Sequence, residues 1–287
     1  MANTCFHGHR VRPVCARRYV VKFAFDGRDF DGYARQRDGH TVEDEVIAGL
    51  RGASIAEDIK RAHFLSAARV DKGVSAVAAA AAITTEAAKA RNDPSLNANV
   101  SGITFHSIVE VPLNFNPRHR AESRWYRYHY KAVGLEQGLD VPLMRDASSL
   151  FLGEHDFSAF ARVEGRSPVR QIQDIRLERK HGFLVLDIWG RSFLWNQTRR
   201  MATALWMVGA RTAAKQDVQD ALEGRGRIAF GPAPAEGLFL LDVIYPGLRF
   251  EHPSRFQPSV LGRLRDDFYR ERCEAMYFEY LRELVPF

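Results

Sequence analysis

The chain of 287 residues is predicted to adopt an α+β fold. Stretches with alternating side chains, typical of strands, are interspersed with stretches that have helical spacing. Several strand-like stretches are joined by short turns, as in hairpins, rather than by helical crossovers. Such connections are typical of mainly antiparallel sheets, so a doubly wound parallel sheet is not expected.

The first half of the chain begins with RRYVVKFAF at residues 17–25, which alternates and predicts a strand with its odd-numbered aromatic residues on one face. The glycine-rich, charged stretch after it predicts a loop. TVEDEVIAGL at 41–50 predicts a helix, because Thr41 is a good N-cap and Asp44 follows three residues later. The alanines at 78–82 favour a helix by propensity, yet their surroundings also suit a strand buried on both faces, and the sequence leaves this open.

Farther along, ITFHSIVEVP at 103–112 predicts a strand, and RWYRYHYKA at 124–132 predicts another in which tyrosines alternate with basic residues. QIQDIRLERKHGFLVLDIWG at 171–190 predicts a hairpin that turns at residues 181–182. SFLWNQTRRMATALWMVGA at 192–210 predicts a helix. PAPAEGLFLLDVIYPG at 232–247 predicts a loop that enters a strand, and residues 260–284 predict an amphipathic helix.

The net charge of +6 favours a polyanionic partner such as RNA, DNA or an acidic membrane face.

Other features of the sequence exclude several classes of protein. No stretch approaches the roughly eighteen apolar residues of a membrane helix, and the N-terminus has no apolar segment of a secretory signal. The three cysteines are too few and odd in number for a disulfide framework, which predicts a cytoplasmic protein. Phosphate-loop and Gly-x-Gly-x-x-Gly motifs are absent, so no nucleotide cofactor is expected.

The N-terminal residues 1–17 are expected to form a flexible extension. They include Cys5, His7, His9 and Cys15, whose spacing is not one of the familiar structural zinc patterns. We therefore predict no metal site there.

The most informative stretch is SAARVDKGVSAVAAAA at residues 66–81. It places Asp71 between Arg69 and Lys72, on a glycine turn that leads into small apolar residues. Burial disfavours a charged carboxylate, and a nearby guanidinium opposes that effect by about 1–3 pKa units. A partly buried carboxylate held by an arginine suits a nucleophile or a general base. On composition alone, however, an ordinary charged turn is the better interpretation.

Seven motifs in a fixed order make a functional role for Asp71 the better interpretation. The motifs span about residues 19–245. In each of them the sequence resembles the TruA family of tRNA pseudouridine synthases, in the form found in archaeal and eukaryotic members. In chain order they are FAFDGRDFDGYARQ, TVEDEV, ARVDKGVSA, FNPRHRAESRWYRY, FLGEHDFSAF, RSFLWNQTRRM and APAEGLFL. One such motif is weak support, whereas seven in order are strong support.

The resemblance implies a pseudouridine synthase fold, in which two sheet-and-helix halves share a central mixed, mainly antiparallel sheet with a cleft between them. It divides the chain into an extension (1–17), an N-terminal half (18–120), a C-terminal half (121–247) and a C-terminal helical extension (248–287). It implies a homodimer that isomerises uridine to pseudouridine at positions 38 to 40 of the tRNA anticodon stem-loop. That isomerisation needs no redox cofactor, metal or ATP.

The resemblance also implies roles for particular residues. Asp71 is the expected catalytic aspartate, and Arg199 is expected to pair with it and keep it charged. Tyr126 is expected to stack on the target uracil. Arg69 is expected to displace or replace the flipped nucleotide. The acid in ARVDKGVSA belongs between cations because it must be charged, oriented and close to a phosphate-rich substrate.

Further basic residues are predicted to line an RNA-binding groove, where phosphate contacts supply salt-sensitive affinity. They are Lys72 beside Asp71, Arg28, Arg35 and Arg37 in the first loop, and Arg118, His119, Arg120 and Arg124 in the middle loop.

The sequence departs from the family pattern in places, and this bears on substrate detail. Val70 stands where a threonine is usual, and Ala34 where a glutamine is common. Two alternatives therefore stay open: a pseudouridine synthase that acts on another RNA, and a tRNA-binding protein that has kept the scaffold without the chemistry. The set of Arg69, Asp71, Tyr126 and Arg199 argues against the second, because a pure binder needs no charged acid in its pocket.

Overall fold

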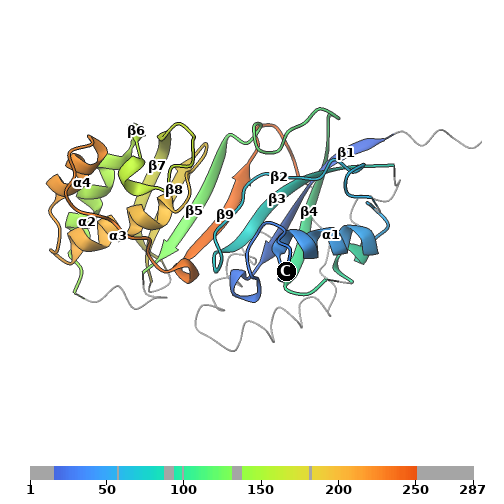
Figure 1. Ribbon diagram of the computed structural model, residues 1–287, viewed down its shortest axis with the longest axis horizontal. Coiled ribbons are helices and arrows are strands. Elements are labelled where there is room, and N and C mark those ends of the chain that lie inside the picture. Colours follow the sequence, from blue (N-terminus) through green and yellow to red (C-terminus); the bar gives the residue numbers. More distant parts are fainter. Residues whose placement is uncertain are drawn as a thin grey trace, which may run out of the picture.

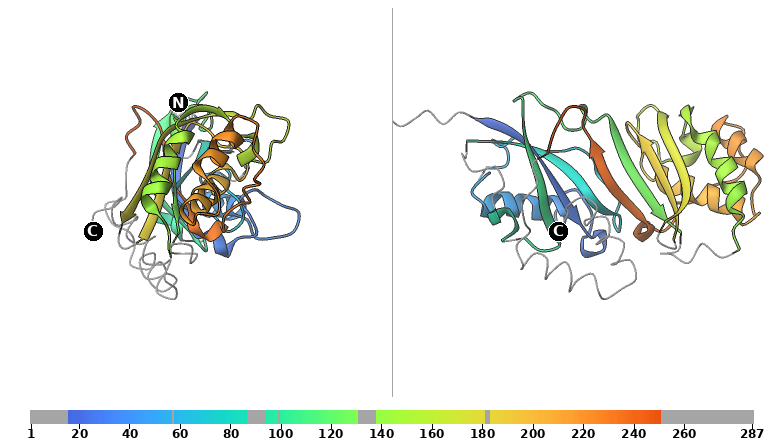
Figure 2. Two further views of the ribbon diagram at one scale, coloured as in Figure 1. Left: turned by 90° about the vertical axis from the view of Figure 1, so that its left-hand side faces the viewer. Right: turned by 180° about the vertical axis from the view of Figure 1, so that it is seen from behind.

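Within the described residues, one open sheet extends along the long axis of the molecule (Figures 1 and 2). The computed structural model describes residues 16–56, 58–86, 94–98, 100–130, 138–180 and 183–250. Cys5, His7, His9 and Cys15, with the rest of the N-terminal extension up to residue 15, lie outside these residues, as does the C-terminal helix predicted over 260–284. The α+β class is confirmed.

Among the described residues, nine strands form the sheet and four segments are α-helices. The strands are β1 Arg17–Phe25, β2 Leu65–Ser66, β3 Ser75–Thr85, β4 Ile103–Val111, β5 Ser123–His129, β6 Gly153–Asp156, β7 Val169–Lys180, β8 Phe183–Gly190 and β9 Leu238–Ile244. The helices are α1 Val42–Gly52, α2 Val141–Ser148, α3 Gln197–Gly209 and α4 Lys215–Leu222.

The strand order is β4-β1-β3-β9-β5-β8-β7-β6, with β2 on β3. Every pairing in it is antiparallel except the short parallel one between β3 and β9. Helix α1 lies at the β4 end of the sheet, while α2, α3 and α4 gather at the β6–β7 end (Figure 1). Strand β9 joins the β4-β1-β3 part of the sheet to the β5-β8-β7-β6 part, because it pairs with β3 on one side and β5 on the other.

The alanine-rich segment is a strand. Alanines 76 and 78–82 of β3 are at most 1% exposed, so the strand is buried on both faces. Strand β1 pairs with β3 from Arg17↔Thr85 to Phe25↔Ala76. This ladder satisfies the backbone hydrogen bonds that a helix would otherwise form internally, so tertiary pairing overrides helix propensity.

Other predicted elements are confirmed with small shifts. Thr41 caps α1: its side chain accepts a hydrogen bond from the Asp44 amide. The hairpin forms as β7 and β8, although its predicted turn at 181–182 lies outside the described residues. The helices α2 and α4 have no counterpart among the predicted elements, and each has only eight residues.

The helix predicted from residue 192 begins later, at Gln197. Asn196 has a left-handed backbone with φ of 63°, which a continuous α-helix does not accommodate. The Gln197 side chain accepts a hydrogen bond from the Leu194 amide, and the Arg162 amide donates to the Trp195 carbonyl. Residues 191–196 are therefore a loop that leads into α3.

Candidate active site

An aspartate–arginine pair links the turn before β3 to the start of α3. Asp71 lies in the turn between β2 and β3, and Arg199 lies in the first turn of α3. The Arg199 Nη1 atom is 3.0 Å from Asp71 Oδ2, and the two side chains are 15% and 21% exposed. The structure thus brings together the two residues that the resemblance pairs, although they are 128 positions apart in sequence.

The turn that carries Asp71 is held by its backbone. The Val74 amide donates to the Asp71 carbonyl over 3.1 Å. Gly73 has φ of +85°, and a Cβ atom there would lie 3.1 Å from Ala235 Cβ, so both the conformation and the space favour glycine. The chain then enters the buried strand β3 directly. This is why the acid lies at the edge of a buried segment.

Arg199 is oriented by acceptors on neighbouring segments. Its Nε atom donates to the Ala233 carbonyl over 2.6 Å, and its Nη1 atom also donates to Asn196 Oδ1 over 3.1 Å. The Ala233 amide in turn donates to the Arg199 carbonyl over 3.2 Å. These contacts hold the planar guanidinium in one orientation, with Nη1 directed at Asp71.

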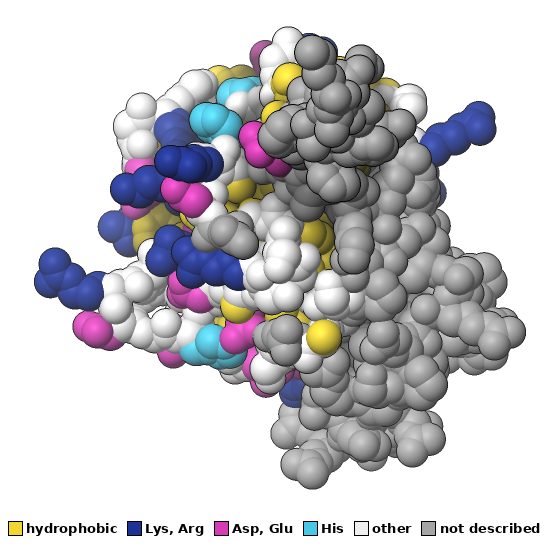
Figure 3. Space-filling view, turned by 90° about the vertical axis from the view of Figure 1, so that its right-hand side faces the viewer, with side chains coloured by type: hydrophobic (Ala, Val, Ile, Leu, Met, Phe, Trp, Pro, Cys, Tyr) yellow, Lys and Arg dark blue, Asp and Glu magenta, His cyan; other side chains and the backbone are white. Residues whose placement is uncertain are grey.

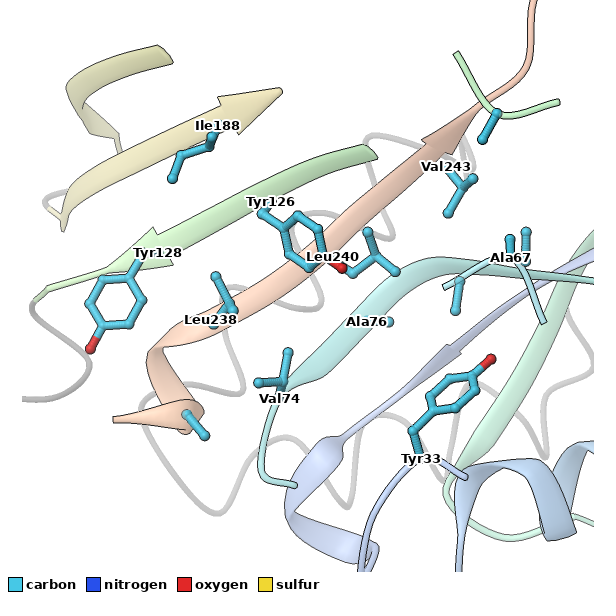
Figure 4. Close-up of a cluster of buried hydrophobic side chains, with 14 of the residues drawn as sticks. Tyr33, Ala67, Val74, Ala76, Tyr126, Tyr128, Ile188, Leu238, Leu240 and Val243 are labelled. Carbon is cyan, nitrogen blue, oxygen red and sulfur yellow. The ribbon is translucent and has the colours of Figure 1, made fainter. Parts of the chain in front are cut away.

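Tyr126 lies on strand β5, and its ring is next to Leu240 of the paired strand β9 (Figure 4). The residue is 7% exposed, and its ring packs edge-on against Phe193 at a centroid distance of 5.1 Å. Burial raises the pKa of Tyr126 to about 12, with an opposing effect of Arg124 and a smaller contribution from Asp71. The phenol is therefore neutral at pH 7 and suits stacking and hydrogen-bond donation rather than action as a base.

Arg124 is a correction to the predicted RNA-binding set. It is 5% exposed, and its guanidinium donates to the carbonyls of Ala67, Arg118 and Arg191; the two Nη2 contacts, to Ala67 and Arg118, are 2.9 Å long. Burial lowers the pKa of Arg124. The side chain ties together three loops around the site and is not presented to RNA.

Arg69 and Lys72 extend from the Asp71 turn into solvent. Arg69 Nε lies 3.8 Å from Glu43 Oε1, and the Arg69 side chain is 59% exposed. Lys72 Nζ lies 3.0 Å from Asp31 Oδ1, and the Lys72 side chain is 68% exposed. Both cations flank Asp71 in sequence, and the exposed Lys72–Asp31 pair is a weak surface ion pair that an incoming polyanion could displace.

Glu43 is a site residue that sequence reasoning missed. It is buried at the start of α1, and Oε1 accepts a hydrogen bond from Ser66 Oγ over 2.9 Å. Its Oε2 atom accepts from the Arg35 amide over 3.2 Å. One carboxylate therefore links Arg69, the loop before α1 and β2. The signal in the sequence was weak, because an acid in the first turn of a helix is common.

The first-loop arginines have acidic neighbours. Arg28 pairs with Asp26 and Arg35 with Asp44. Figure 3 views the end of the molecule where α1 lies, and in its described part Lys and Arg side chains lie beside Asp and Glu side chains. The described part of this face therefore carries charges of both signs.

The middle loop is different. Arg118 is half-buried, while His119 and Arg120 are exposed. His119, Arg120 and Arg191 line a cavity of about 640 Å³ between the β4–β5 loop, β7 and the segment after β9. Arg191 was not among the predicted residues, although it stands in the RSFLWNQTRRM motif. Asp71, Tyr126 and Arg199 do not line this cavity.

Within the described residues, no group of three or more His, Cys, Asp or Glu side chains is arranged to hold a metal ion. None of the described helices is long and apolar enough to cross a membrane.

Comparison with known proteins agrees with the motifs. A family model described as tRNA pseudouridine synthase matches residues 147–246. The chain is 41% identical over 259 residues to tRNA pseudouridine synthase A of Pyrococcus abyssi, which covers 85% of this chain and 95% of that protein. It is 37% identical over 265 residues to the protein of the same name from Pyrococcus horikoshii, with 91% and 97% covered.

Proposed function

The chain belongs to the family of tRNA pseudouridine synthases, which are isomerases, and we propose that it converts uridine to pseudouridine in the tRNA anticodon stem-loop with Asp71 as the catalytic residue. The proposal places the target at positions 38 to 40 of the tRNA. The observation that carries it is the contact between Asp71, in the turn before β3, and Arg199, at the start of α3, with Tyr126 close enough to Asp71 for the carboxylate to affect the pKa of the phenol.

The reaction breaks the N1–C1′ bond of uridine, turns the base and joins C5 to C1′. The target base must leave the RNA stack, because an enzyme cannot reach its atoms inside a helix. Asp71 either attacks the sugar or removes its C2′ proton to help the glycosidic bond break. The single contact with Arg199 Nη1 orients the carboxylate while leaving Oδ1 without a described donor.

Tyr126 supports the flipped uracil by stacking. Phe193 packs against its edge at 5.1 Å, which limits rotation of the ring. Because the phenol is neutral, its hydroxyl can donate a hydrogen bond or a proton to the base. Arg69 projects from the same turn as Asp71 and takes the place of the flipped nucleotide in the RNA.

The proposal includes a homodimer in the cytoplasm, with tRNA contacting both subunits. Light scattering coupled to size-exclusion chromatography measures the mass of the protein alone and with tRNA. A monomer under both conditions would remove the dimer from the proposal.

The proposed reaction is tested by incubating the protein with an unmodified tRNA transcript and no cofactor. Carbodiimide treatment and primer extension then map pseudouridine. New stops at uridines of the anticodon stem are expected, and Asp71→Asn is expected to remove them while tRNA binding survives. Stops only in other RNAs would support a different substrate. No stops together with tight, salt-sensitive tRNA binding would support a non-catalytic binding protein.

A further inference from the structure

Trp195 is an exposed tryptophan on the loop that leads into α3. It is 42% exposed, while its neighbour Leu194 is buried and Phe193 contacts Tyr126. Single exposed apolar residues are normal on protein surfaces. The position of this one in the fold and the cation on its ring distinguish it from them.

The loop lies next to the catalytic pair. Asn196 Oδ1 and Asp71 Oδ2 both accept hydrogen bonds from Arg199 Nη1, over 3.1 and 3.0 Å, so these two oxygens are at most about 6 Å apart. Trp195 precedes Asn196 by one peptide, which separates their Cα atoms by about 3.8 Å. The backbone of Trp195 is therefore close to the Asp71–Arg199 pair, and the residue is 42% exposed, whereas Tyr126 is 7% exposed.

The backbone around Trp195 is fixed. The Arg162 amide donates to the Trp195 carbonyl over 2.9 Å, in an isolated antiparallel bridge. On the other side, the Gln197 amide donates to the Leu194 carbonyl over 3.2 Å. The indole thus stands on a constrained segment, so little conformational entropy is lost when a ligand stacks on it.

A cation already stacks on this ring. The Arg162 guanidinium carbon is 4.4 Å from the centre of the Trp195 ring, and the Arg162 side chain is 63% exposed. The same guanidinium has Nε 3.7 Å from Glu164 Oε1. Arg166 and Arg191, which belong to the same two loops as Arg162 and Trp195, are also exposed. An aromatic ring with an arginine beside it can bind an unpaired base and its phosphate.

We propose that Trp195 stacks on an unpaired nucleobase of the RNA substrate other than the target uridine, with Arg162 supporting the ring. This inference rests on the proposed function, because it assumes an RNA in the Asp71 site. Tyr126 serves the flipped uracil inside the pocket. Trp195 stacks on a second base of the RNA loop, which loses a stacking neighbour when the target uridine flips out.

The test measures the affinity of an anticodon stem-loop RNA for the wild-type protein and three variants at one salt concentration. Loss of a base–aromatic stack costs about 1–3 kcal/mol, so Trp195→Ala is expected to weaken binding by roughly 5- to 150-fold. Trp195→Phe keeps a stacking ring and is expected to recover most of that loss. Leu152→Ala is the matched control, because Leu152 is equally exposed at 42% but has no aromatic ring on which a base could stack.

A second set of RNAs, each with one loop nucleotide made abasic, identifies the stacked base. One abasic RNA is expected to bind the wild-type protein weakly and to bind Trp195→Ala with no further loss. Unchanged affinity of Trp195→Ala would overturn the proposal. So would losses that add at every abasic position, or an effect of Trp195→Ala on subunit association alone. A thermal melt of each variant checks folding, and Trp195→Phe remains informative if Trp195→Ala unfolds.

Binding is measured here without reference to turnover, which keeps the two proposals separate. If the coupling between Trp195 and one base is found but no pseudouridine forms, the proposed reaction fails and the stacking site stands. If pseudouridine forms without the coupling, only the stacking site fails.

Discussion

Two arginine–aspartate pairs lie in different regions of this molecule and differ in how many hydrogen bonds the carboxylate accepts. Asp187 of β8 accepts from Arg127 through two hydrogen bonds of 2.7 and 2.9 Å, and also from Trp125 and Lys180. That pair is almost fully buried, with side-chain exposures of 4% and 0%. Asp71 accepts only from Arg199 among the described side chains and is 21% exposed.

The difference separates an acid that holds the sheet together from one that is available for chemistry. A buried carboxylate whose lone pairs are all occupied has no capacity left for a substrate. Asp71 retains an oxygen and access to solvent, while its orientation is set by one cation. Substitutions at the two pairs are therefore expected to affect different properties, turnover at one and stability at the other.

The largest expected effect is on turnover. Asp71→Asn should lower the single-turnover rate by about a thousandfold or more, equivalent to about 4 kcal/mol of activation free energy. The free energy of unfolding should change by less than about 1 kcal/mol, because the ion pair is partly exposed. Primer-extension assays and urea denaturation measure the two quantities. A variant that keeps its rate would refute Asp71 as the catalytic residue.

The next effect is on stability. Asp187→Asn leaves the Arg127 cation buried without its counter-charge, and it should lower the free energy of unfolding by about 3–5 kcal/mol. The turnover of the folded fraction should stay within a few-fold of wild type. A double variant, Arg127→Met with Asp187→Leu, should recover much of the loss in urea denaturation. Equal stability of the single variant and wild type would show that this pair does not hold the sheet.

A pH effect is expected in the same region. His129 of β5 is fully buried, and burial lowers the pKa of its imidazole from 6.5 to about 3, with a further contribution from Arg127. Between these values the unfolded chain binds a proton that the folded chain does not, so stability falls as pH falls. The loss from this residue should reach about 3 kcal/mol between pH 6.5 and about pH 4.

Chemical denaturation at several pH values, with His129→Gln as comparison, measures that loss. The variant should show a shallower dependence of unfolding free energy on pH, because the titrating imidazole is gone. If the unfolding free energy of the two proteins depends on pH with the same slope, groups other than His129 cause the pH sensitivity.

The smallest effect tests the orientation of Arg199. Arg199→Lys keeps the charge but loses the fork that bonds Ala233, Asn196 and Asp71 together. The single-turnover rate should fall by about 10- to 100-fold, equivalent to about 1.4–2.8 kcal/mol, with RNA affinity within a few-fold of wild type. Arg199→Met, which also removes the charge, should be slower still. If lysine restores full rate, charge alone suffices and the orientation is unimportant.

Much of the fold could be predicted from local pattern. The alternation in residues 17–25 and the Thr41 cap each correspond to an observed element. The short helices α2 and α4 could not be found by periodicity, because eight residues make little more than two turns. The fate of the alanine segment depended on its pairing with β1, which lies about sixty residues away along the chain and leaves no local signal.

For the site, the motifs predicted which residues meet, but charge was a poor guide to exposure. Arg124 was assigned to RNA by its charge, yet it is in phase with Tyr126 and Tyr128 on β5. Alternation alone could not predict its burial, because Arg127 and His129 on the opposite face of β5 are also buried. Glu43 had no comparable signal, because its role depends on a contact with Arg69 across two separate elements.

The position of β9 has a consequence for synthesis of the chain. This strand lies between β3 and β5, yet it is the last described strand to be made. Until residue 244 has left the ribosome, β3 lacks β9 beside its first residues, and β5 has an open edge along most of its length. The nascent chain therefore carries two partly folded halves with exposed strand edges, which are prone to wrong pairing. Asp71 and Arg199 are brought together only when the late strand closes the sheet.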